Sequence, residues 1–356
     1  MIKQISNLFA VSFLSLSTFA ADPNLQHKSD GAQPPCSQCE AAKASKQISL
    51  AQEFAKQYIQ NIAKPFPKCD NQEGPGCLLI NWMKWKNADY AKNCKGFFMN
   101  EDGTIGSFSQ MTGKLMFDDV LDNGEKSVFL QDNPMFEKYC PGFNQFSIDQ
   151  KIAFHGWIFE LTAFPENVCS NKNSVVPGVD SAAACMFQLN YPRSARSWRG
   201  SGLKVNHCDI SEKALLTDAG CIGCSFDIYK KKTMKDGTPL GLIDKDGTKT
   251  SGSYWASQTP ISEAQEKCLE STFQTVKMGG KEVKQPRKIT VKVKGVTKTQ
   301  YEFISKCAYL NKKVNPNNEW LARYKFFKRI QRFPLCKTEF AKKEIADLEQ
   351  YQKTKK

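Results

Sequence analysis

Apolar residues recur along the chain with two different periods, and each period predicts a different kind of element. Residues 40–64 and 319–333 place apolar side chains at helical spacing, which predicts two amphipathic helices. Pro65 ends the first of them. The second carries basic residues beside its apolar stripe, so it either packs on the main domain or lies on a membrane surface, and packing is favoured. Residues 288–304 alternate apolar and polar positions around a glycine, which predicts a β-hairpin.

A strongly apolar run after residue 147 predicts a helix inside the core. Its sequence is IAFHGWIFELTAF, and the preceding SIDQ, from Ser147 to Gln150, has the form of a capping box. Residues 66–140 differ, because the turn signals NEDG and DNG separate short apolar runs. This pattern predicts short strands and loops rather than long helices. Cysteine-rich loops and short helices are expected after the core helix, as far as Ser257.

Residues 1–20 have the layout of a cleaved secretory signal peptide. A lysine precedes an apolar run from Leu8 to Phe19, and small residues follow. An uncleaved membrane anchor is the alternative, but the chain turns polar at Asp22, which favours cleavage. Residues 21–39 then form a polar linker. No later stretch is long and apolar enough to span a bilayer, so we expect an exported, soluble protein that is periplasmic or secreted.

All fourteen cysteines follow the predicted signal peptide, and an oxidising compartment favours pairing them into disulfides. The connectivity of the seven possible bridges cannot be predicted. Two CxxC pairs, Cys36 with Cys39 and Cys221 with Cys224, are also compatible with a zinc site or a redox dithiol. The pairs lie far apart, and the chain has only three histidines, so structural disulfides are the better interpretation. Two aspartate-containing loops resemble calcium loops but lack the twelfth, acidic position, so no metal is predicted.

Positive charge is concentrated at the C-terminal end. The whole chain carries +14, whereas Lys277 to Lys356 contains 22 Lys and Arg against 7 Asp and Glu, a net of +15. Such a segment suits an anionic wall polymer, a membrane surface or released nucleic acid. A solvated surface without a partner explains the charge equally well.

Two glutamates, Glu160 and Glu166, lie on the apolar stretch, six positions apart. Burial disfavours the ionised form of a glutamate and so favours the protonated form that a general acid needs. Arginine or backbone donors also satisfy a buried glutamate, so burial alone assigns no role. Six residues turn a helix by about 240°, and the two side chains therefore cannot face the same cleft.

The sequence around the second glutamate resembles the goose-type lysozyme and lytic transglycosylase superfamily. Ala163 to Cys169 (AFPENVC) matches a helix end of the form A-x-x-E-S-x-(F or C), and Cys185 to Leu189 (CMFQL) matches the later motif G-L-M-Q-L. The tripeptides WRG (198–200) and SYW (253–255), with part of 221–225, resemble elements of the secreted, cysteine-rich lysozyme-like proteins of predatory bacteria. The resemblance covers residues 141–258, about a third of the chain.

This resemblance implies roles for four residues. Glu166 would be the general acid that protonates the glycosidic oxygen between N-acetylmuramic acid and N-acetylglucosamine. Gln188 and Tyr191 would bind substrate, and Asp180 would be the second carboxylate. A packing role for Tyr191 and a turn role for Asp180 are the more ordinary explanations. No cofactor is implied, because one glutamate can act without a metal.

The chain departs from the family pattern at several positions. Pro165 precedes the proposed catalyst, and Asn167 replaces a serine. Cys185 stands where a glycine normally lets the backbone approach the sugar, while Cys221 and Ser225 replace an asparagine and a glycine. Because Cys185 and Cys221 both occupy altered family positions, we hypothesise that they form a disulfide beside the cleft.

Together these observations predict a mainly α, lysozyme-like (α+β) core at 141–258 that is stabilised by disulfides. An N-terminal helix with a cysteine-containing loop and strand region (40–140) precedes it, and a basic C-terminal extension with a β-hairpin and a helix (259–356) follows. We expect an exported muramidase-like enzyme, hydrolase or lytic transglycosylase, that cleaves peptidoglycan glycan strands, native or N-deacetylated. The alternative is an inactive lysozyme-fold protein that binds cell wall or another anionic surface. A nucleic-acid or lipid binder is a third interpretation, and no obligate protein partner is implied.

Overall fold

The computed structural model describes part of the chain: residues 75–89, 92–97, 104–167, 169, 176–177, 182–191, 208, 212–242, 255–310 and 318–354. The predicted signal peptide, linker and first amphipathic helix lie outside the described residues. So do Cys36, Cys39, Asp180 and the WRG tripeptide.

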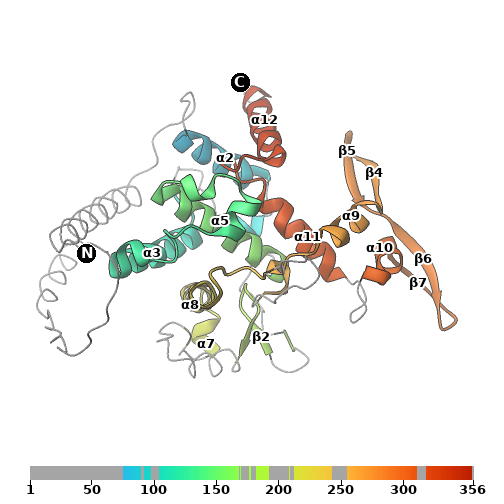
Figure 1. The fold of residues 1–356 in the computed structure, drawn as a ribbon, viewed down its shortest axis with the longest axis horizontal. Coiled ribbons are helices and arrows are strands. Elements are labelled where there is room, and N and C mark those ends of the chain that lie inside the picture. The colour runs from blue at the N-terminus through green and yellow to red at the C-terminus, as the bar shows by residue number, and fades with distance from the viewer. Residues whose placement is uncertain are drawn as a thin grey trace, which may run out of the picture. The chain divides into compact units, whose positions relative to one another are not determined.

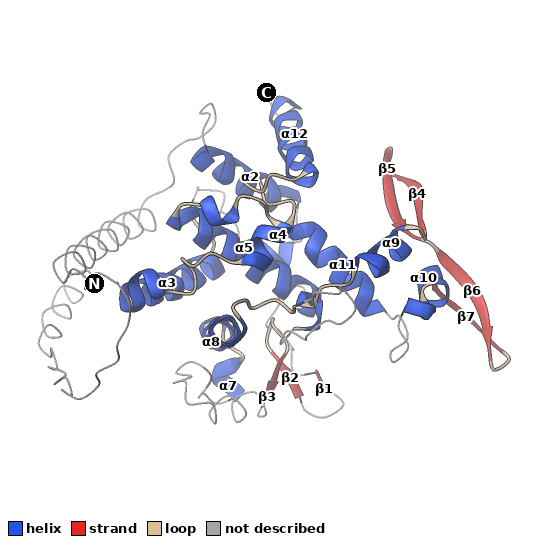
Figure 2. Ribbon diagram, in the orientation of Figure 1, coloured by secondary structure: helices blue, strands red, loops and turns tan. Residues whose placement is uncertain are grey.

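Within the described residues the chain is mainly helical, with three small antiparallel sheets (Figures 1 and 2). The α-helices are α2 (Pro75–Asp89), α3 (Ser107–Asn123), α4 (Pro134–Tyr139), α5 (Ile148–Asn167), α7 (Glu212–Leu215), α8 (Asp218–Asp236), α9 (Glu263–Glu270), α10 (Glu302–Lys306), α11 (Asn318–Ile330) and α12 (Glu339–Thr354). Short 3-10 helices are η1 (Lys92–Phe97), η2 (Gly124–Lys126), η3 (Phe143–Gln145), η4 (Ala256–Gln258) and η5 (Ala308–Leu310). None of the described helices combines the length and the apolar character needed to cross a membrane.

The first sheet follows α5 and has the strand order β1-β2-β3, formed by β1 (Val176–Pro177), β2 (Ala182–Ala184) and β3 (Leu189–Tyr191). The other two sheets are separate hairpins. The strands β4 (Phe273–Met278) and β5 (Lys281–Pro286) form one, and β6 (Lys288–Val293) and β7 (Val296–Tyr301) form the other. The second hairpin confirms the alternation in the sequence, whereas the first was not predicted.

The prediction of strands and loops for residues 66–140 was wrong. The described part of this region contains the 15-residue helix α2 and the 17-residue helix α3 instead. The DNG signal marks the end of α3, because Gly124 takes a positive φ of 56° and its N–H donates to the Val120 carbonyl. Glycine at a helix C-terminus and glycine in a hairpin turn have the same local signature, and here the helix is the correct assignment.

Helix α5 begins and is buried as the sequence predicts. The Ser147 N–H donates to Gln150 Oε1 at 3.0 Å, and the Gln150 N–H donates to Ser147 Oγ at 3.4 Å, which is a reciprocal capping box. Most of the helix is buried between Lys151 and Ala163. A helix that is apolar on all sides has to be covered on all sides, and α3, α11 and η1 each contact α5.

The principal core combines segments from both ends of the described chain. Aromatic side chains dominate it, and Trp82 of α2 meets Trp157 of α5 edge to face with ring centroids 4.9 Å apart. Its C-terminal members come from α11, α12 and the loop between them: Phe326, Phe327, Ile330, Phe333, Cys336, Ala341 and Leu348. The indole N–H of Trp157 also donates to the Arg329 carbonyl at 3.1 Å. Packing on the main domain is therefore the correct interpretation of the apolar stripe on residues 319–333.

A second, smaller core holds the bases of the two hairpins. It contains Ile261, Cys268, Leu269, Phe303, Cys307, Trp320 and Leu321, with Phe273 and Tyr301 partly buried against it. The disulfide Cys268–Cys307 joins α9 to the residue after α10. Helix α11 contributes its first turn to this core and its last two turns to the principal core, so one helix connects both.

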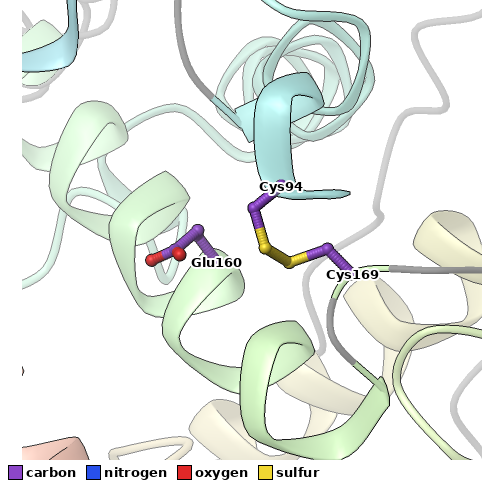
Figure 3. Close-up of side chains that lie close together, drawn as sticks. All are labelled: Cys94, Glu160 and Cys169. Atoms are coloured by element: carbon purple, nitrogen blue, oxygen red, sulfur yellow. A yellow bond between two sulfur atoms is a disulfide. The ribbon is translucent and has the colours of Figure 1, made fainter. Parts of the chain in front are cut away.

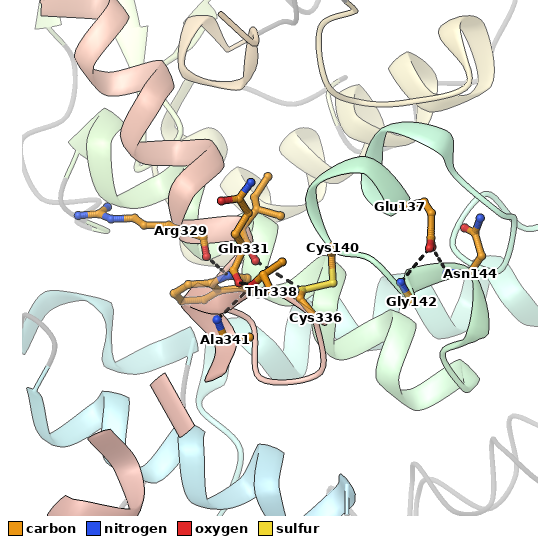
Figure 4. The surroundings of a disulfide bond; sticks show 11 residues. Glu137, Cys140, Gly142, Asn144, Arg329, Gln331, Cys336, Thr338 and Ala341 are labelled. Carbon is orange, nitrogen blue, oxygen red and sulfur yellow. Dashed lines mark hydrogen bonds between the residues drawn. A yellow bond between two sulfur atoms is a disulfide. The ribbon is translucent and has the colours of Figure 1, made fainter. Parts of the chain in front are cut away.

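Five disulfides join described cysteines, as the even cysteine count predicts. They are Cys94–Cys169, Cys140–Cys336, Cys185–Cys221, Cys208–Cys224 and Cys268–Cys307. Figure 4 shows the second of these, which ties the end of α4 to the loop before α12 across 196 residues of sequence. Cys221 and Cys224 bond to different distant cysteines, so their CxxC motif is a pair of structural half-cystines rather than a redox dithiol.

Candidate functional site

The C-terminal end of α5 carries the candidate glutamate. Glu166 lies in the last turn of the helix and is half-buried, one residue after the exposed Pro165. Its Oε1 accepts a hydrogen bond from Ser257 Oγ at 3.4 Å. The helix continues through Pro165 to Asn167, because a proline near the end of a helix interrupts only the backbone bond that its missing N–H would have made.

Residues 255–258 pack directly on the last two turns of α5. The Gln258 amide donates to Thr162 Oγ1 at 2.8 Å, one turn before the candidate glutamate. The Trp255 indole N–H donates to the Phe187 carbonyl at 2.9 Å. This segment begins at the end of the SYW tripeptide, so the structure brings two of the family-like motifs together. Ser257 was missed in the sequence, where its signal is its place two residues after Trp255.

The turn between β2 and β3 holds the CMFQL motif. Cys185 and Gln188 both have positive φ, 61° and 50°, a backbone region that favours glycine. The Gln188 amide donates to the Cys185 carbonyl at 2.9 Å, so it closes its own turn. Phe187 fixes this turn on the core by meeting Phe159 of α5 edge to face, with centroids 5.7 Å apart.

The hypothesised disulfide between Cys185 and Cys221 is confirmed. It joins the β2–β3 turn to the first turn of α8, where Thr217 caps the helix by accepting from the Gly220 N–H. A second bond, Cys208–Cys224, attaches a further loop residue one turn along the same helix. Cys185 is fully buried, so its sulfur lies inside the molecule and not on the surface of the turn.

The structure tests the other site predictions only in part. Tyr191 lies at the end of β3, paired with Ala182, but its side chain is outside the described part of the molecule. Asp180 lies outside the described residues altogether, so its role as second carboxylate stays a prediction. The side-chain amide of Gln188 bonds within its own turn, and its role in substrate binding stays a prediction.

Glu160 has entirely different surroundings from Glu166, as the helical rotation predicts. It is 1% exposed, and neither carboxyl oxygen has a hydrogen-bond partner. Burial raises its pKa to about 8, against the opposing effect of the Arg329 and Lys86 charges. At neutral pH it is therefore a protonated carboxylic acid in the core. A polymeric substrate cannot reach it, which excludes Glu160 as a general acid despite its suitable pKa.

One group of potential metal ligands occurs among the described residues. Glu160, Cys94 and Cys169 place ligand atoms within 4.8 Å of one another, and all three are buried. Figure 3 shows why this is not a metal site: the two sulfur atoms are bonded to each other, so no thiolate faces the carboxyl group. The disulfide joins η1 to the residue just after α5 and lies on one side of the Glu160 carboxyl group.

The buried histidine of α5 is also a packing residue. His155 is 1% exposed and sits among aromatic rings, with Nδ1 2.7 Å from the Tyr229 hydroxyl. Burial lowers its pKa to about 3, so it stays neutral under physiological conditions. It has neither the accessibility nor the basicity of a general base.

Comparison with known proteins gives no assignment. No protein-family model, no curated protein and no solved structure matches the chain. The site therefore has to be interpreted from its own residues.

Proposed function

We propose that this protein is a lysozyme-like glycosidase that cleaves the glycan strands of peptidoglycan, with Glu166 as the general acid. One observation carries the proposal: α5 presents a half-buried glutamate in its last turn, and a hydroxyl from residue 257 bonds to it from 91 positions away. A carboxyl group that is both accessible and oriented by a neighbour meets the geometric requirement for proton transfer to a substrate.

The order of elements around this glutamate supports the proposal. A long apolar helix ends one residue after the glutamate, a three-stranded antiparallel sheet follows at 176–191, and the helices α7 and α8 come after it. Helices combined with a small sheet are compatible with the lysozyme-like (α+β) core that the resemblance implies for residues 141–258. The lysozyme-like core is part of the proposal, alongside the chemistry.

The departures from the family pattern are compatible with activity. Pro165 is accommodated in the last turn of α5 without ending the helix before Glu166. Cys185 adopts a positive φ, a conformation that glycine takes most easily, and its disulfide with Cys221 holds that conformation. A residue held in the left-handed region costs roughly 1 kcal/mol or more, and a covalent link is a direct way to maintain it.

The proposed reaction begins with proton transfer from the Glu166 carboxyl group to the glycosidic oxygen. The bond between the anomeric carbon and that oxygen then breaks, and the sugar on the other side leaves with the proton. Water adds to the anomeric carbon in a hydrolase, whereas the sugar's own C6 hydroxyl closes a 1,6-anhydro ring in a lytic transglycosylase. In either case the attacking O–H gives its proton back to the Glu166 carboxylate, which restores the acid. Export to the periplasm or medium is part of the proposal, and the disulfides favour an oxidising compartment.

The test is mass spectrometry of soluble fragments released from purified sacculi, native and N-deacetylated. Wild-type protein should release fragments, with reducing ends for a hydrolase or 1,6-anhydro ends for a transglycosylase. Glu166→Gln should lower the rate at least about a hundredfold, the scale of general acid catalysis. Glu160→Gln is the matched control on the same helix, and it should keep most of the activity.

Release by Glu166→Gln at the wild-type rate would refute the assignment of the general acid. Silence from wild type on both substrates, combined with binding of both proteins to sacculi, would instead establish the inactive wall-binding protein. Circular dichroism and an intact-disulfide mass for each variant ensure that loss of activity is not loss of fold.

A further inference from the structure

The hairpins β4–β5 and β6–β7 carry a strongly basic, exposed surface. Residues 273–301 contain eight Lys and Arg and a single acidic residue, Glu282. Arg287 pairs with Glu302 at 3.3 Å, and the Lys288 ammonium lies 5.5 Å from the Tyr301 ring centroid. The remaining lysines are exposed and make no ion pair with another described residue: Lys277, Lys281, Lys284, Lys292, Lys294 and Lys298.

Hairpin β6–β7 gathers its aliphatic side chains on one face, which also carries Lys298 and Gln300 opposite Val291 and Ile289; we call this the apolar face. The register places Val293 opposite Val296, and Ile289 and Val291 lie on the same face because side chains alternate along a strand. Val293 and Val296 are 45% and 55% exposed. None of these four residues belongs to a hydrophobic core, so the apolar face is uncovered within the described part of the chain.

Hairpin β4–β5 repeats this arrangement. Val276 pairs with Val283, and Met278 lies on the same face at the end of its strand. Met278 is 58% exposed and Val283 is 40% exposed. As in the other hairpin, the most exposed apolar side chains flank the turn, and a lysine stands beside them.

Both turns are tight and lie at the ends of the hairpins remote from their base. Gly279 and Gly280 in the first turn have positive φ, as do Lys294 and Gly295 in the second, the geometry of a two-residue hairpin turn that matches strand twist. The bases are fixed, because the Arg287 N–H donates to the Thr272 carbonyl at the second core. Figure 1 shows the two hairpins running away from α9 and α10.

We propose that these two hairpins bind an anionic lipid bilayer, with Met278, Val293 and Val296 entering the interface and the lysines contacting the headgroups. The lysines are complementary in charge to anionic headgroups. The exposed apolar side chains near the turns match the hydrocarbon of a bilayer, which a wall polysaccharide or a nucleic acid does not offer. Lysines also protect edge strands from aggregation, but that role leaves the apolar faces unexplained.

A second copy of the chain is a weaker occupant of the apolar faces. Joining the hairpin pairs of two chains would bring together surfaces that each carry eight basic residues and one acidic residue over positions 273–301, and like charges at an interface oppose association. A bilayer that contains anionic lipid satisfies both the charge and the apolar side chains. The inference does not depend on glycan cleavage, because lipid vesicles contain no glycan.

The experiment uses the full oxidised chain with phosphatidylcholine vesicles, with and without phosphatidylglycerol, in a sedimentation assay. Binding should require phosphatidylglycerol and weaken with added salt. Lys294→Gln and Lys298→Gln should each weaken partitioning about fivefold, and Val293→Ser with Val296→Ser should weaken it more than about tenfold. Thr290→Ser with Thr299→Ser, on the opposite face of the same hairpin, is the matched control and should change nothing.

A depth probe separates insertion from surface attraction. Tryptophan fluorescence of Val296→Trp should be quenched by brominated lipid more than that of Thr297→Trp on the other face. Equal quenching at both positions would overturn the proposal. So would full vesicle binding by the serine variants that soluble polyphosphate displaces, because both results would show that charge attraction alone holds the protein on the vesicle. If the protein does not bind vesicles but forms a dimer, and the serine variants dissociate that dimer, the apolar faces are assigned to a second copy of the chain.

Discussion

The protonated glutamate in the core should make the stability of this protein fall as pH rises. Glu160 has an ordinary pKa of 4.5 in the unfolded chain and a pKa of about 8 in the folded protein. Between these values the unfolded state releases a proton that the folded state retains, so unfolding becomes more favourable with each pH unit. Below pH 4.5 both states are protonated, and above pH 8 both are ionised, so the effect is confined to this interval.

The magnitude follows from the same two values. At 1.36 kcal/mol for each pH unit, the interval from 4.5 to 8 corresponds to a loss of about 5 kcal/mol in the free energy of unfolding. This is a large fraction of the roughly 5–15 kcal/mol that a folded domain has available. The charges of Lys86 and Arg329 oppose the effect of burial and are already included in the shift.

The assay is urea unfolding followed by tryptophan fluorescence between pH 5 and 9, with the disulfides intact. Glu160→Gln cannot ionise, so its stability relative to wild type should be similar at pH 5 and should rise by several kcal/mol at pH 8.5. Comparison with the variant removes every other titrating group from the result. A stability difference between variant and wild type that does not change with pH would refute the assignment of a neutral buried acid. A variant that becomes less stable relative to wild type at pH 8.5 would show that the pKa shift of Glu160 has the opposite sign.

Three further substitutions test the site and the core. Cys185→Ala with Cys221→Ala opens a bridge that spans 36 positions and should cost about 4 kcal/mol in urea unfolding; an unchanged midpoint would contradict this. Ser257→Ala removes the hydroxyl beside the proposed catalytic glutamate, and we expect about tenfold slower release of glycan fragments with little change in stability. Lys86→Met leaves Glu344 buried without the ammonium that lies 2.5 Å away, and should cost about 3 kcal/mol or more. Replacing both members of that pair by apolar residues should recover most of the loss in a double-mutant cycle.

The elements that the sequence predicts correctly are those whose local signals agree with their tertiary surroundings. Helix α5 has a capping box and an apolar run long enough to exclude a strand. Hairpin β6–β7 has strict alternation around a lysine–glycine turn. Helix α11 has an apolar stripe at helical spacing, and that stripe is buried against two cores.

Two of the missed elements, α3 and α8, have local signals that point in more than one direction. Helix α3 ends at Asn123–Gly124, a dipeptide that also begins hairpins. Helix α8 contains two glycines and two cysteines in its first two turns, so its helical state depends on burial and on disulfides that no local pattern specifies. Hairpin β4–β5 does carry a Gly279–Gly280 turn between alternating residues, and that signal was sufficient to predict it.

The sequence predicts a candidate site at the end of α5, but it does not show which of the two glutamates is buried and which is accessible. Sequence reasoning assigned the raised pKa and the catalytic role to the same kind of residue, a glutamate near the end of a buried helix. The structure separates the two properties: Glu160 has the raised pKa and no access, whereas Glu166 has access and a hydroxyl partner. Burial depends on neighbours that lie far away in sequence, here α11 and the Cys94–Cys169 disulfide.

Packing and covalent links stabilise different parts of this molecule. Helix α5 and its neighbours are held mainly by aromatic packing. The segments that surround the end of α5 are short strands and turns, including two non-glycine residues with positive φ in the Cys185 to Gln188 turn. Three of the five described disulfides attach to these segments or to the helix start beside them. The turn is already held by the buried side chains of Met186 and Phe187, and the disulfide from Cys185 to Cys221 adds a covalent constraint. Packing and the disulfide together explain how Cys185, which is not a glycine, keeps a positive φ.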